Sequence, residues 1–277
     1  MGLSNSIYKN LMHGIKITLK SSFYNPYKKV NINRFLLNFI KLLPPNKNHT
    51  HNLLGHKTFF RGGLEYLHGL KEIFVEGIYD QHLPEQAYIL DCGAHLGLSV
   101  IYLKSICPSA RIICFEPDET NFQNLQNNIL SHNLKDIDAK KEAVWTENKE
   151  LNFIQQGTMS SKLGENGDNT VKVKAVRLKD FIDRKIDFLK LDIEGAEYAV
   201  LKDISENLIN VDKMFIEYHG VFHQNNELLE MLNIITAAGF HYYIKEAFPI
   251  YTQPFLSQKK DIDSYDIQLN LFCFRMI

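Results

Sequence analysis

Residues 88–97 read YILDCGAHLG, a short apolar run followed by a turn with two glycines. The apolar run predicts a buried strand, and the helical pattern at 99–106 predicts a helix directly after the turn. Gly93 and Gly97 allow the chain to turn sharply and allow a ligand to approach bare backbone. The free N–H groups at the start of the helix would then face that ligand. This stretch therefore predicts the first strand, the ligand-binding turn and the first helix of an α/β fold.

The alternation of apolar runs and helical patterns continues to the end of the chain. Strands are expected at 111–115, near 143–145, and at 186–191, 213–218, 240–244 and 267–274, with helices at 119–130, 196–204 and 227–238. Residues 151–176 are expected to form a strand pair around the polar loop 164–168. No helix is expected between the last two strands, so the final strand can return antiparallel. The pattern predicts a doubly wound α/β fold with a mainly parallel seven-stranded sheet.

Charge divides the chain into two parts. Residues 1–64 contain ten Lys and Arg and no acid, whereas the rest contains 21 basic and 32 acidic residues. Apolar residues at helical spacing predict two amphipathic helices, over 7–19 and 31–41, the second ended by Pro44-Pro45. We therefore expect a basic amphipathic helical extension at 1–64 and one catalytic domain at 65–277. The extension could pack on the catalytic domain or make peripheral contact with an anionic membrane, and the sequence leaves both open.

The cysteine and hydropathy patterns indicate the cellular compartment of the protein. The four cysteines lack the C-x-x-C spacing of zinc and redox sites, and most lie in apolar runs, which is typical of reduced core thiols. No apolar run approaches the ~18 residues that span a bilayer, and the N-terminus lacks the pattern of a secretory signal. We expect a cytoplasmic protein, with peripheral contact on the inner face of the membrane as an option. The oligomeric state is left open.

Polar residues follow the first two predicted strands, at the edge of the sheet where open α/β folds bind ligands. The turn from Asp91 to Gly97 has the spacing D-x-G-x-x-x-G, whereas a dinucleotide pyrophosphate requires G-x-G-x-x-G. S-adenosylmethionine has no phosphate and needs no such cradle. Glu116 ends the second strand, where a carboxylate would accept hydrogen bonds from the two hydroxyls of a ribose. The predicted cofactor-binding residues are Asp91, Gly93, Ala94, His95, Gly97, Glu116 and Pro117.

Three segments together resemble the FkbM family of methyltransferases. They are residues 89–97, residues 115–117 and DFLKLDIEGAE at 187–197, and the resemblance spans roughly 72–240. The family more often has Asn at the position of His95. The resemblance implies a Rossmann-like class I methyltransferase fold, S-adenosylmethionine as methyl donor and O-methylation, often of sugar hydroxyls in glycans, glycolipids or natural products. It also implies that the turn after the first strand lines the methionine part of the donor and that Glu116 binds its ribose.

Methyl transfer to a hydroxyl requires a general base or a cation near the donor. Asp192 follows the fourth strand, and Glu217 and His219 lie on one face at the end of the fifth. These three are the predicted catalytic residues, with His219 as proton acceptor beside an orienting carboxylate and Asp192 as base or cation ligand. Glu194 and Glu197 lie in the first turn of a predicted helix, where acids stabilise the helix dipole, and are left out. A divalent cation is possible, and its ligand set stays open.

Two other functions fit parts of the same pattern. A nicotinamide-dependent Rossmann oxidoreductase would share the sheet, the glycine turn and the acid, but it requires the missing G-x-G-x-x-G. A non-catalytic nucleoside-binding component of a glycan pathway would fit the basic N-terminus but not the complete set of catalytic candidates. Nucleic acid is not an expected partner, because the catalytic part is net acidic and would repel phosphates. We expect a small-molecule or glycan acceptor.

Overall fold

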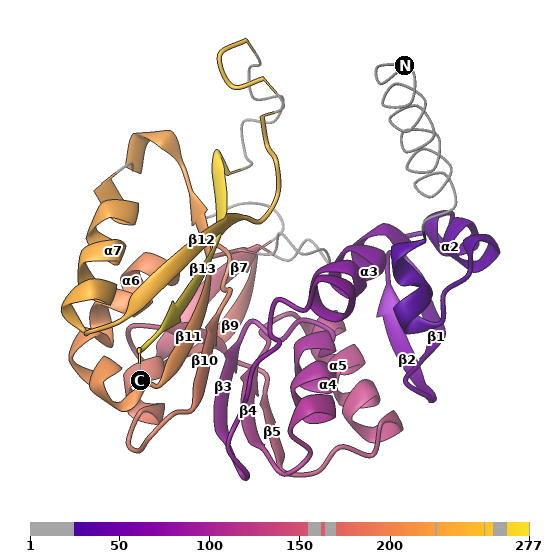
Figure 1. Ribbon diagram of the computed structural model, residues 1–277, viewed down its shortest axis with the longest axis horizontal. Coiled ribbons are helices and arrows are strands. Elements are labelled where there is room, and N and C mark those ends of the chain that lie inside the picture. The colour runs from indigo at the N-terminus through magenta and orange to yellow at the C-terminus, as the bar shows by residue number, and fades with distance from the viewer. Residues whose placement is uncertain are drawn as a thin grey trace, which may run out of the picture.

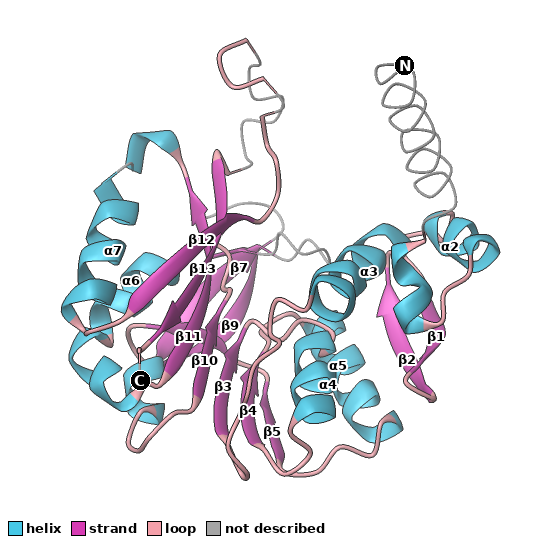
Figure 2. Ribbon diagram, in the orientation of Figure 1, coloured by secondary structure: helices cyan, strands magenta, loops and turns pink. Residues whose placement is uncertain are grey.

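The computed structural model describes residues 25–154, 162–163, 170–224, 226–251, 253–256 and 265–276. Its centre is a twisted sheet with helices on both faces (Figure 1). Figure 2 shows a separate small hairpin beside the N-terminal helices. The predicted helix at 7–19 and the polar loop at 164–168 lie outside the described residues.

Seven strands form the central sheet in the order β12-β13-β11-β10-β3-β4-β5. Their bounds are β3 Tyr88–Cys92, β4 Arg111–Phe115, β5 Ile137–Lys140, β10 Phe188–Leu191, β11 Lys213–Gly220, β12 His241–Glu246 and β13 Ile267–Phe274. Strands β5, β4, β3, β10 and β11 are parallel to one another, whereas β13 runs antiparallel between β11 and β12. The predicted mainly parallel sheet and its antiparallel last strand are confirmed.

The point where the strand order reverses lies between β3 and β10. The connection after β3 leads to β4 on one side, and the connection after β10 leads to β11 on the other. Such a reversal opens a crevice beyond the carboxyl ends of the two strands, which is where open α/β sheets bind ligands. A ligand-binding site is therefore expected at the segments that follow β3 and β10.

Helices cover both faces of the sheet. On one face lie α4 Leu98–Ile106 and α5 Glu119–Ser131, and on the other lie α6 Glu197–Asp203 and α7 Asn226–Ala237 (Figure 1). Three short 3-10 helices lie in the connections: η3 Leu178–Phe181 follows β9, η4 Ser205–Asn210 follows α6, and η5 Phe222–Gln224 follows β11. Neighbouring residues of β3 enter different cores, because Ile89 packs on the α4 side and Leu90 on the α6 side. Both faces of the central strands β3 and β10 are buried, which explains why these strands are mostly apolar.

The N-terminal part contains η1 Pro26–Val30, α2 Arg34–Lys41, β1 Asn48–Leu53, β2 His56–Arg61, α3 Gly63–Leu70 and the π-helical η2 Lys71–Glu76. The predicted helix at 31–41 is confirmed by α2. The extension is not helical throughout, because β1 and β2 form an antiparallel hairpin that the sequence analysis did not predict. Its turn places Leu54 and Gly55 at φ 52 and φ 85. The expected domain boundary after residue 64 falls inside α3.

The N-terminal elements pack into the same core as α4 and α5. Ile40 of α2 and Phe60 of β2 are buried in that core. Asn128 on α5 joins the hairpin to the glycine turn, because its amide donates to Phe59 O at 2.9 Å and to Leu96 O at 2.8 Å. Its Oδ1 accepts the Phe59 N–H at 2.6 Å. The hairpin therefore helps to fix the position of the glycine turn.

A second sheet contains β6 Ala143–Trp145, β7 Lys149–Ile154, β8 Lys162–Leu163 and β9 Thr170–Arg177, in the order β6-β9-β7-β8. The expected strand pair in 151–176 is confirmed by β7 and β9. The prediction that 143–145 forms the third strand of the central sheet is wrong, because this segment is β6 and pairs with β9 in the second sheet. That third strand is β5, a half-exposed edge strand. The sequence of β5 mixes polar and apolar residues, so the more apolar segment β6 was taken for the strand.

Two expectations from the composition concern the whole chain. Within the described ranges, no helix is both long enough and apolar enough to cross a membrane. Cys92, Cys107, Cys114 and Cys273 are all buried and all carry free thiols. The expectation of core thiols is confirmed.

Candidate active site

The glycine turn after β3 packs against the segments that follow β4 and β10. Gly93 and Gly97 have φ values of 87° and 90°, which favour glycine. A Cβ on Gly93 would lie only 1.7 Å from the carbonyl oxygen of Asp192. The N–H groups of Gly93 and Ala94 donate to Phe115 O at 3.1 and 2.9 Å. Glycine at 93 is therefore required by backbone conformation and by close packing.

A buried lysine links the first strand of the site to the fourth. Lys190 Nζ lies 3.3 Å from Asp91 Oδ1 and 3.1 Å from Asp192 Oδ2, and it donates to Gly93 O at 2.6 Å. Burial alone would lower the pKa of Lys190, but Asp192 and Asp91 raise it well above its ordinary value. Asp91 Oδ2 accepts the Ser99 hydroxyl at 2.5 Å. Asp91 thus orients the turn, and its predicted contact with the cofactor stays a prediction.

Glu116 follows β4 directly and is a buried carboxylate with an exposed fraction of 6%. Its Oε1 accepts the Asp118 N–H at 2.9 Å, and its Oε2 accepts the His95 N–H at 2.8 Å. Burial raises the pKa of Glu116 to about 7. A carboxylate has about four acceptor positions, so both oxygens can accept a further hydrogen bond. Pro117 is half-buried beside it, and its predicted cofactor contact is untested.

His95 connects the glycine turn to the N-terminal part. Its φ of 50° is left-handed, and its Nε2 lies 3.4 Å from Glu65 Oε1 on α3. Burial alone would lower the pKa of His95, but Glu65 raises it above the ordinary value. Sequence reasoning missed Glu65 because it lies upstream of every motif. Its position is notable only as the first acid after the basic segment.

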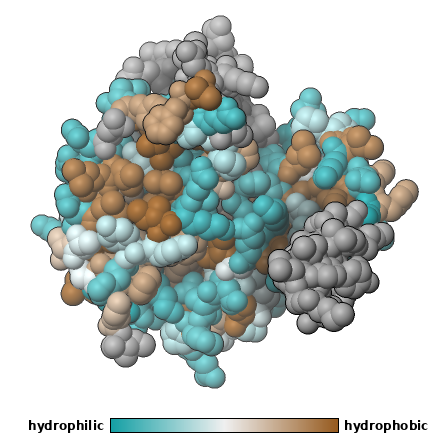
Figure 3. Space-filling model, turned by 45° about the horizontal axis from the view of Figure 1, so that its top comes forward, coloured by the Kyte–Doolittle hydropathy of each residue, from teal (hydrophilic) through white to brown (hydrophobic). Residues whose placement is uncertain are grey.

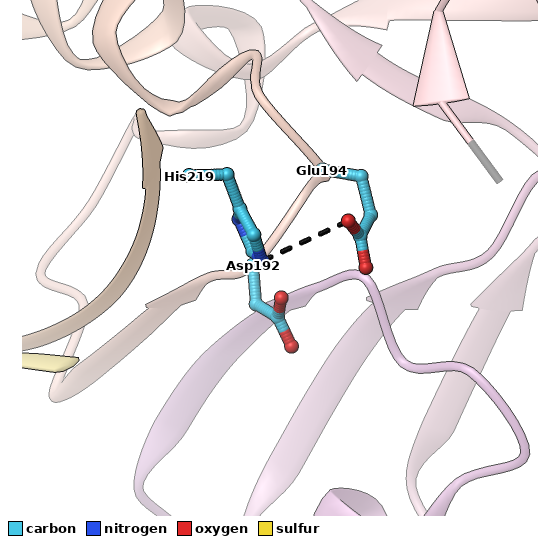
Figure 4. A group of neighbouring side chains, drawn as sticks. All are labelled: Asp192, Glu194 and His219. Carbon is cyan, nitrogen blue, oxygen red and sulfur yellow. Dashed lines mark ion pairs between the residues drawn. The ribbon is translucent and has the colours of Figure 1, made fainter. Parts of the chain in front are cut away.

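The predicted catalytic residues meet beyond the ends of β10 and β11. His219 is buried, and its Nδ1 lies 3.1 Å from Glu197 Oε1. Its Nε2 lies 3.7 Å from both Glu194 Oε2 and Glu217 Oε1. Figure 4 shows the carboxylates of Asp192 and Glu194 on the side of the ring that carries Nε2. Asp192, Glu194 and His219 each place one possible ligand atom within 4.8 Å of the others.

Glu197 fixes the tautomer of His219. Glu197 Oε1 also accepts the N–H groups of Ile193 and Gly195, at 3.0 and 3.1 Å. An oxygen that serves three donors in this way acts as a carboxylate acceptor, so His219 Nδ1 must carry a proton. Nε2 is therefore the ring atom that faces the site. The sequence analysis left Glu194 and Glu197 out because acids at a helix start are common without a catalytic role.

Burial and mutual charge interactions shift the pKa values of Glu194, Glu217 and His219. Burial raises the pKa of Glu194 to about 8, and burial together with Asp192 raises the pKa of Glu217 to about 8. Burial alone would lower the pKa of His219, but Glu197 raises it well above its ordinary value. Clusters of groups with perturbed pKa values often mark sites of proton transfer or ion binding. Figure 3, with this edge turned forward, shows hydrophilic side chains across the middle of the face.

The strand order, the glycine turn after β3 and the acid after β4 define a Rossmann-like fold of the class I methyltransferases. The family model described as Methyltransferase FkbM domain matches residues 91–242, which is more than half of the chain. The chain therefore belongs to the FkbM family of methyltransferases. The resemblance predicted from its three segments is confirmed.

Known relatives agree with this family. Methyltransferase 1 of Beauveria bassiana is 27% identical over 184 residues, covering 56% of this chain and 73% of the relative. Methyltransferase sdnD of Sordaria araneosa is 28% identical over 175 residues, covering 49% and 68%. The crystal structure of an FkbM methyltransferase from Methylobacillus flagellatus has a TM-score of 0.51 and 18% identity, covering 75% of this chain. The match spans 48% of that solved chain, and at this identity it shows the fold.

Proposed function

We propose that this chain is an S-adenosylmethionine-dependent O-methyltransferase that acts on a hydroxyl of a sugar in a glycan, glycolipid or natural product. The observation that carries the proposal is the pairing of two features at one sheet edge. A buried acceptor, Glu116, follows β4, and a cluster of acids and an imidazole follows β10 and β11. The first suits a ribose diol and the second suits removal of a hydroxyl proton. The test is transfer of a labelled methyl group to oxygen.

The residues after β3 and β4 fit the methyl donor. Glu116 presents two oxygens that are each held by one backbone N–H, so they are oriented before a ligand arrives. The turn from Gly93 to Gly97 offers backbone without large side chains at its two glycines. When bound, the donor supplies a methyl group activated by a sulfonium. The cofactor residues predicted from sequence therefore keep their roles in this proposal.

The residues after β10 and β11 fit activation of the acceptor. Side chains of Asp192 and Glu217 are 25% and 18% exposed, whereas that of His219 is 2% exposed. We therefore place Asp192 and Glu217 against the acceptor hydroxyl and His219 behind them. In the transfer the acceptor O–H bond breaks, the new O–CH3 bond forms as the methyl–sulfur bond breaks, and the proton passes to Glu217. A pKa of about 8 for Glu217 suits a base that works near neutral pH.

A sugar hydroxyl fits the chemistry of the site. Asp192, Glu194 and Glu217 are three partly exposed carboxylates at the ends of β10 and β11, close to His219. Carboxylates accept hydrogen bonds from several hydroxyls at once, which favours a polyhydroxylated acceptor. They also disfavour a phosphate or another anion.

Membership of a methyltransferase family favours methyl transfer over nicotinamide-dependent oxidation. The complete cluster at the ends of β10 and β11 favours an enzyme over a non-catalytic nucleoside-binding component. A non-catalytic component would not require several carboxylates held close together, because their mutual repulsion lowers stability.

We also propose that the N-terminal surface contacts an anionic membrane through the outer face of α2. Phe35, Phe39 and Leu42 are 84%, 55% and 83% exposed, and they lie at helical spacing on one face. The opposite face packs inward through Ile40. Residues 1–64 supply only basic charge, which attracts anionic headgroups. Figure 3 shows hydrophobic side chains at the N-terminal side of the molecule.

A further inference from the structure

We propose that Asp192, Glu194 and His219 bind one divalent metal ion at the carboxyl ends of β10 and β11. The three donors are two carboxylates and one imidazole, a mixed oxygen and nitrogen set that suits Mn²⁺ or a similar ion. Each residue places one ligand atom within 4.8 Å of the others. Ligands on opposite sides of an ion with bonds of roughly 2.1 Å lie about 4.2 Å apart. Small side-chain rotations would therefore bring all three onto one ion.

The buried imidazole is a separate observation that points to an ion. The His219 side chain is 2% exposed, and its Nε2 is directed at the carboxylates. The nearest described acids, Glu194 and Glu217, lie 3.7 Å from Nε2, which is longer than a hydrogen bond. In the described part of the chain, Nε2 thus has no partner at hydrogen-bond distance. A bound cation between these groups would give it one.

Glu197 completes the arrangement without contacting the ion. It accepts the Nδ1 proton of His219 at 3.1 Å, and its own side chain is 1% exposed. Histidines that bind metals commonly donate their other ring N–H to a carboxylate, which fixes the ring and makes the ligand nitrogen more basic. The pair Glu197 and His219 has that arrangement, with Nε2 left for the ion.

Charge at this edge also favours a cation. Asp192, Glu194 and Glu217 are three partly exposed carboxylates close to His219, and the buried cation Lys190 is already shared between Asp91 and Asp192. A divalent ion would reduce the repulsion that remains between the carboxylates. Glu217 lies two residues before His219 on β11, with Oε1 3.7 Å from Nε2, and it can act as a fourth ligand or as the proton acceptor.

The site deepens the proposed function and rests on it for its role in catalysis. Side chains of Asp192 and Glu194 are 25% and 20% exposed, so an ion bound by them could be reached from solvent. An acceptor hydroxyl bound there would have its pKa lowered by the ion, and its proton would pass to Glu217. The binding step itself needs neither donor nor acceptor and can be tested alone.

The test is a titration of the metal-free full chain with Mn²⁺, in which the concentration of free ion is measured by electron paramagnetic resonance. One ion per chain is expected, and Glu194→Gln should weaken binding ten- to a hundredfold. Glu206→Gln changes an acid that is 87% exposed on η4, and it should bind Mn²⁺ as the wild type does. Unchanged S-adenosylhomocysteine affinity shows that the variants are folded.

Equal Mn²⁺ affinity of the wild type, Glu194→Gln and Asp192→Asn would overturn the proposal, as would failure of the wild type to bind at millimolar Mn²⁺. Full methyl transfer in the presence of a chelator would also overturn it while leaving the proposed function intact. Mn²⁺ binding that is lost in Glu194→Gln, in a protein that transfers no methyl group, would support the metal site and count against the proposed function instead.

Discussion

His219 on β11 and Glu197 at the start of α6 are joined through Nδ1 and Oε1 at 3.1 Å, although 22 residues separate them in the chain. Glu197 also closes the turn before α6 by accepting the N–H groups of Ile193 and Gly195. One buried carboxylate therefore fixes both the backbone that carries Glu194 and the imidazole that faces it. The geometry of the candidate site therefore depends on a residue that was left out of the predicted catalytic set.

Glu197→Gln should lower turnover about ten- to a hundredfold, because the amide is a weaker acceptor for the His219 N–H. The pKa of His219 should fall, since Glu197 is the main group that raises it. Affinity for S-adenosylhomocysteine should not change. Proton NMR titration of the imidazole separates this positioning role from a loss of folding, and an unshifted His219 titration would contradict it.

Asp192→Asn and Glu217→Gln should each lower kcat by about 10²- to 10⁴-fold, the usual contribution of a positioned acid or base. KM for the donor should stay nearly constant, because neither side chain contacts the predicted ribose site. The exposed acid Glu119 on α5, with a side-chain exposure of 61%, offers Glu119→Gln as a control. Wild-type turnover by both variants would remove Asp192 and Glu217 from the mechanism.

Donor affinity should depend on pH through Glu116. Its pKa of about 7 means that a proton must leave before both oxygens can accept ribose hydroxyls. Affinity for S-adenosylhomocysteine should therefore be full above pH 8 and fall up to tenfold per pH unit below 7. Calorimetry between pH 5.5 and 8.5 measures this, and Glu116→Gln should bind more weakly and lose the dependence. An equal slope in the variant would assign the titration to another group.

The membrane proposal predicts that the full chain co-sediments with vesicles that contain anionic lipid and that binding weakens with salt. Replacing Phe35, Phe39 and Leu42 by Ser should reduce the bound fraction about tenfold or more, because the inserted apolar surface is lost. The matched control replaces Ile209 and Leu229, which are 75% and 60% exposed on η4 and α7. Equal sedimentation of the two variants would contradict the assignment to α2.

Much of the sheet could be predicted because its central strands β4, β3, β10 and β11 are mostly buried. The apolar runs of β3, β4 and β10 are each followed by a glycine or an acidic residue. Gly93, Glu116 and Asp192 were therefore placed at the carboxyl ends of their strands, where the structure has them. The hairpin β1–β2 was missed because its strands are rich in His, Asn and Lys, and the pattern shows only a weak alternation around Gly55. The third strand was missed because β5 is a half-exposed edge.

The site was predictable only in part. The motif after β10 identified Asp192, and the two-residue period of β11 paired Glu217 with His219. Glu194 and Glu197 were visible in the sequence, but their positions at a helix start gave them an ordinary explanation. Only the folded chain shows that a left-handed Glu194, at φ 55, points at His219. The contact of Glu65 with His95 joins residues 30 positions apart and carries no local signal.

The central claim is methyl transfer from S-adenosylmethionine to a sugar oxygen. The direct measurement incubates the purified chain with trideuteromethyl-labelled S-adenosylmethionine and carbohydrate, glycolipid and small-molecule fractions of host cells that lack the protein, followed by mass spectrometry. The account predicts a trideuteromethyl ether on a carbohydrate oxygen, formed by the wild type and strongly reduced with Asp192→Asn. Label found only on nitrogen, carbon or sulfur, or no label from a protein that binds S-adenosylhomocysteine, would contradict it.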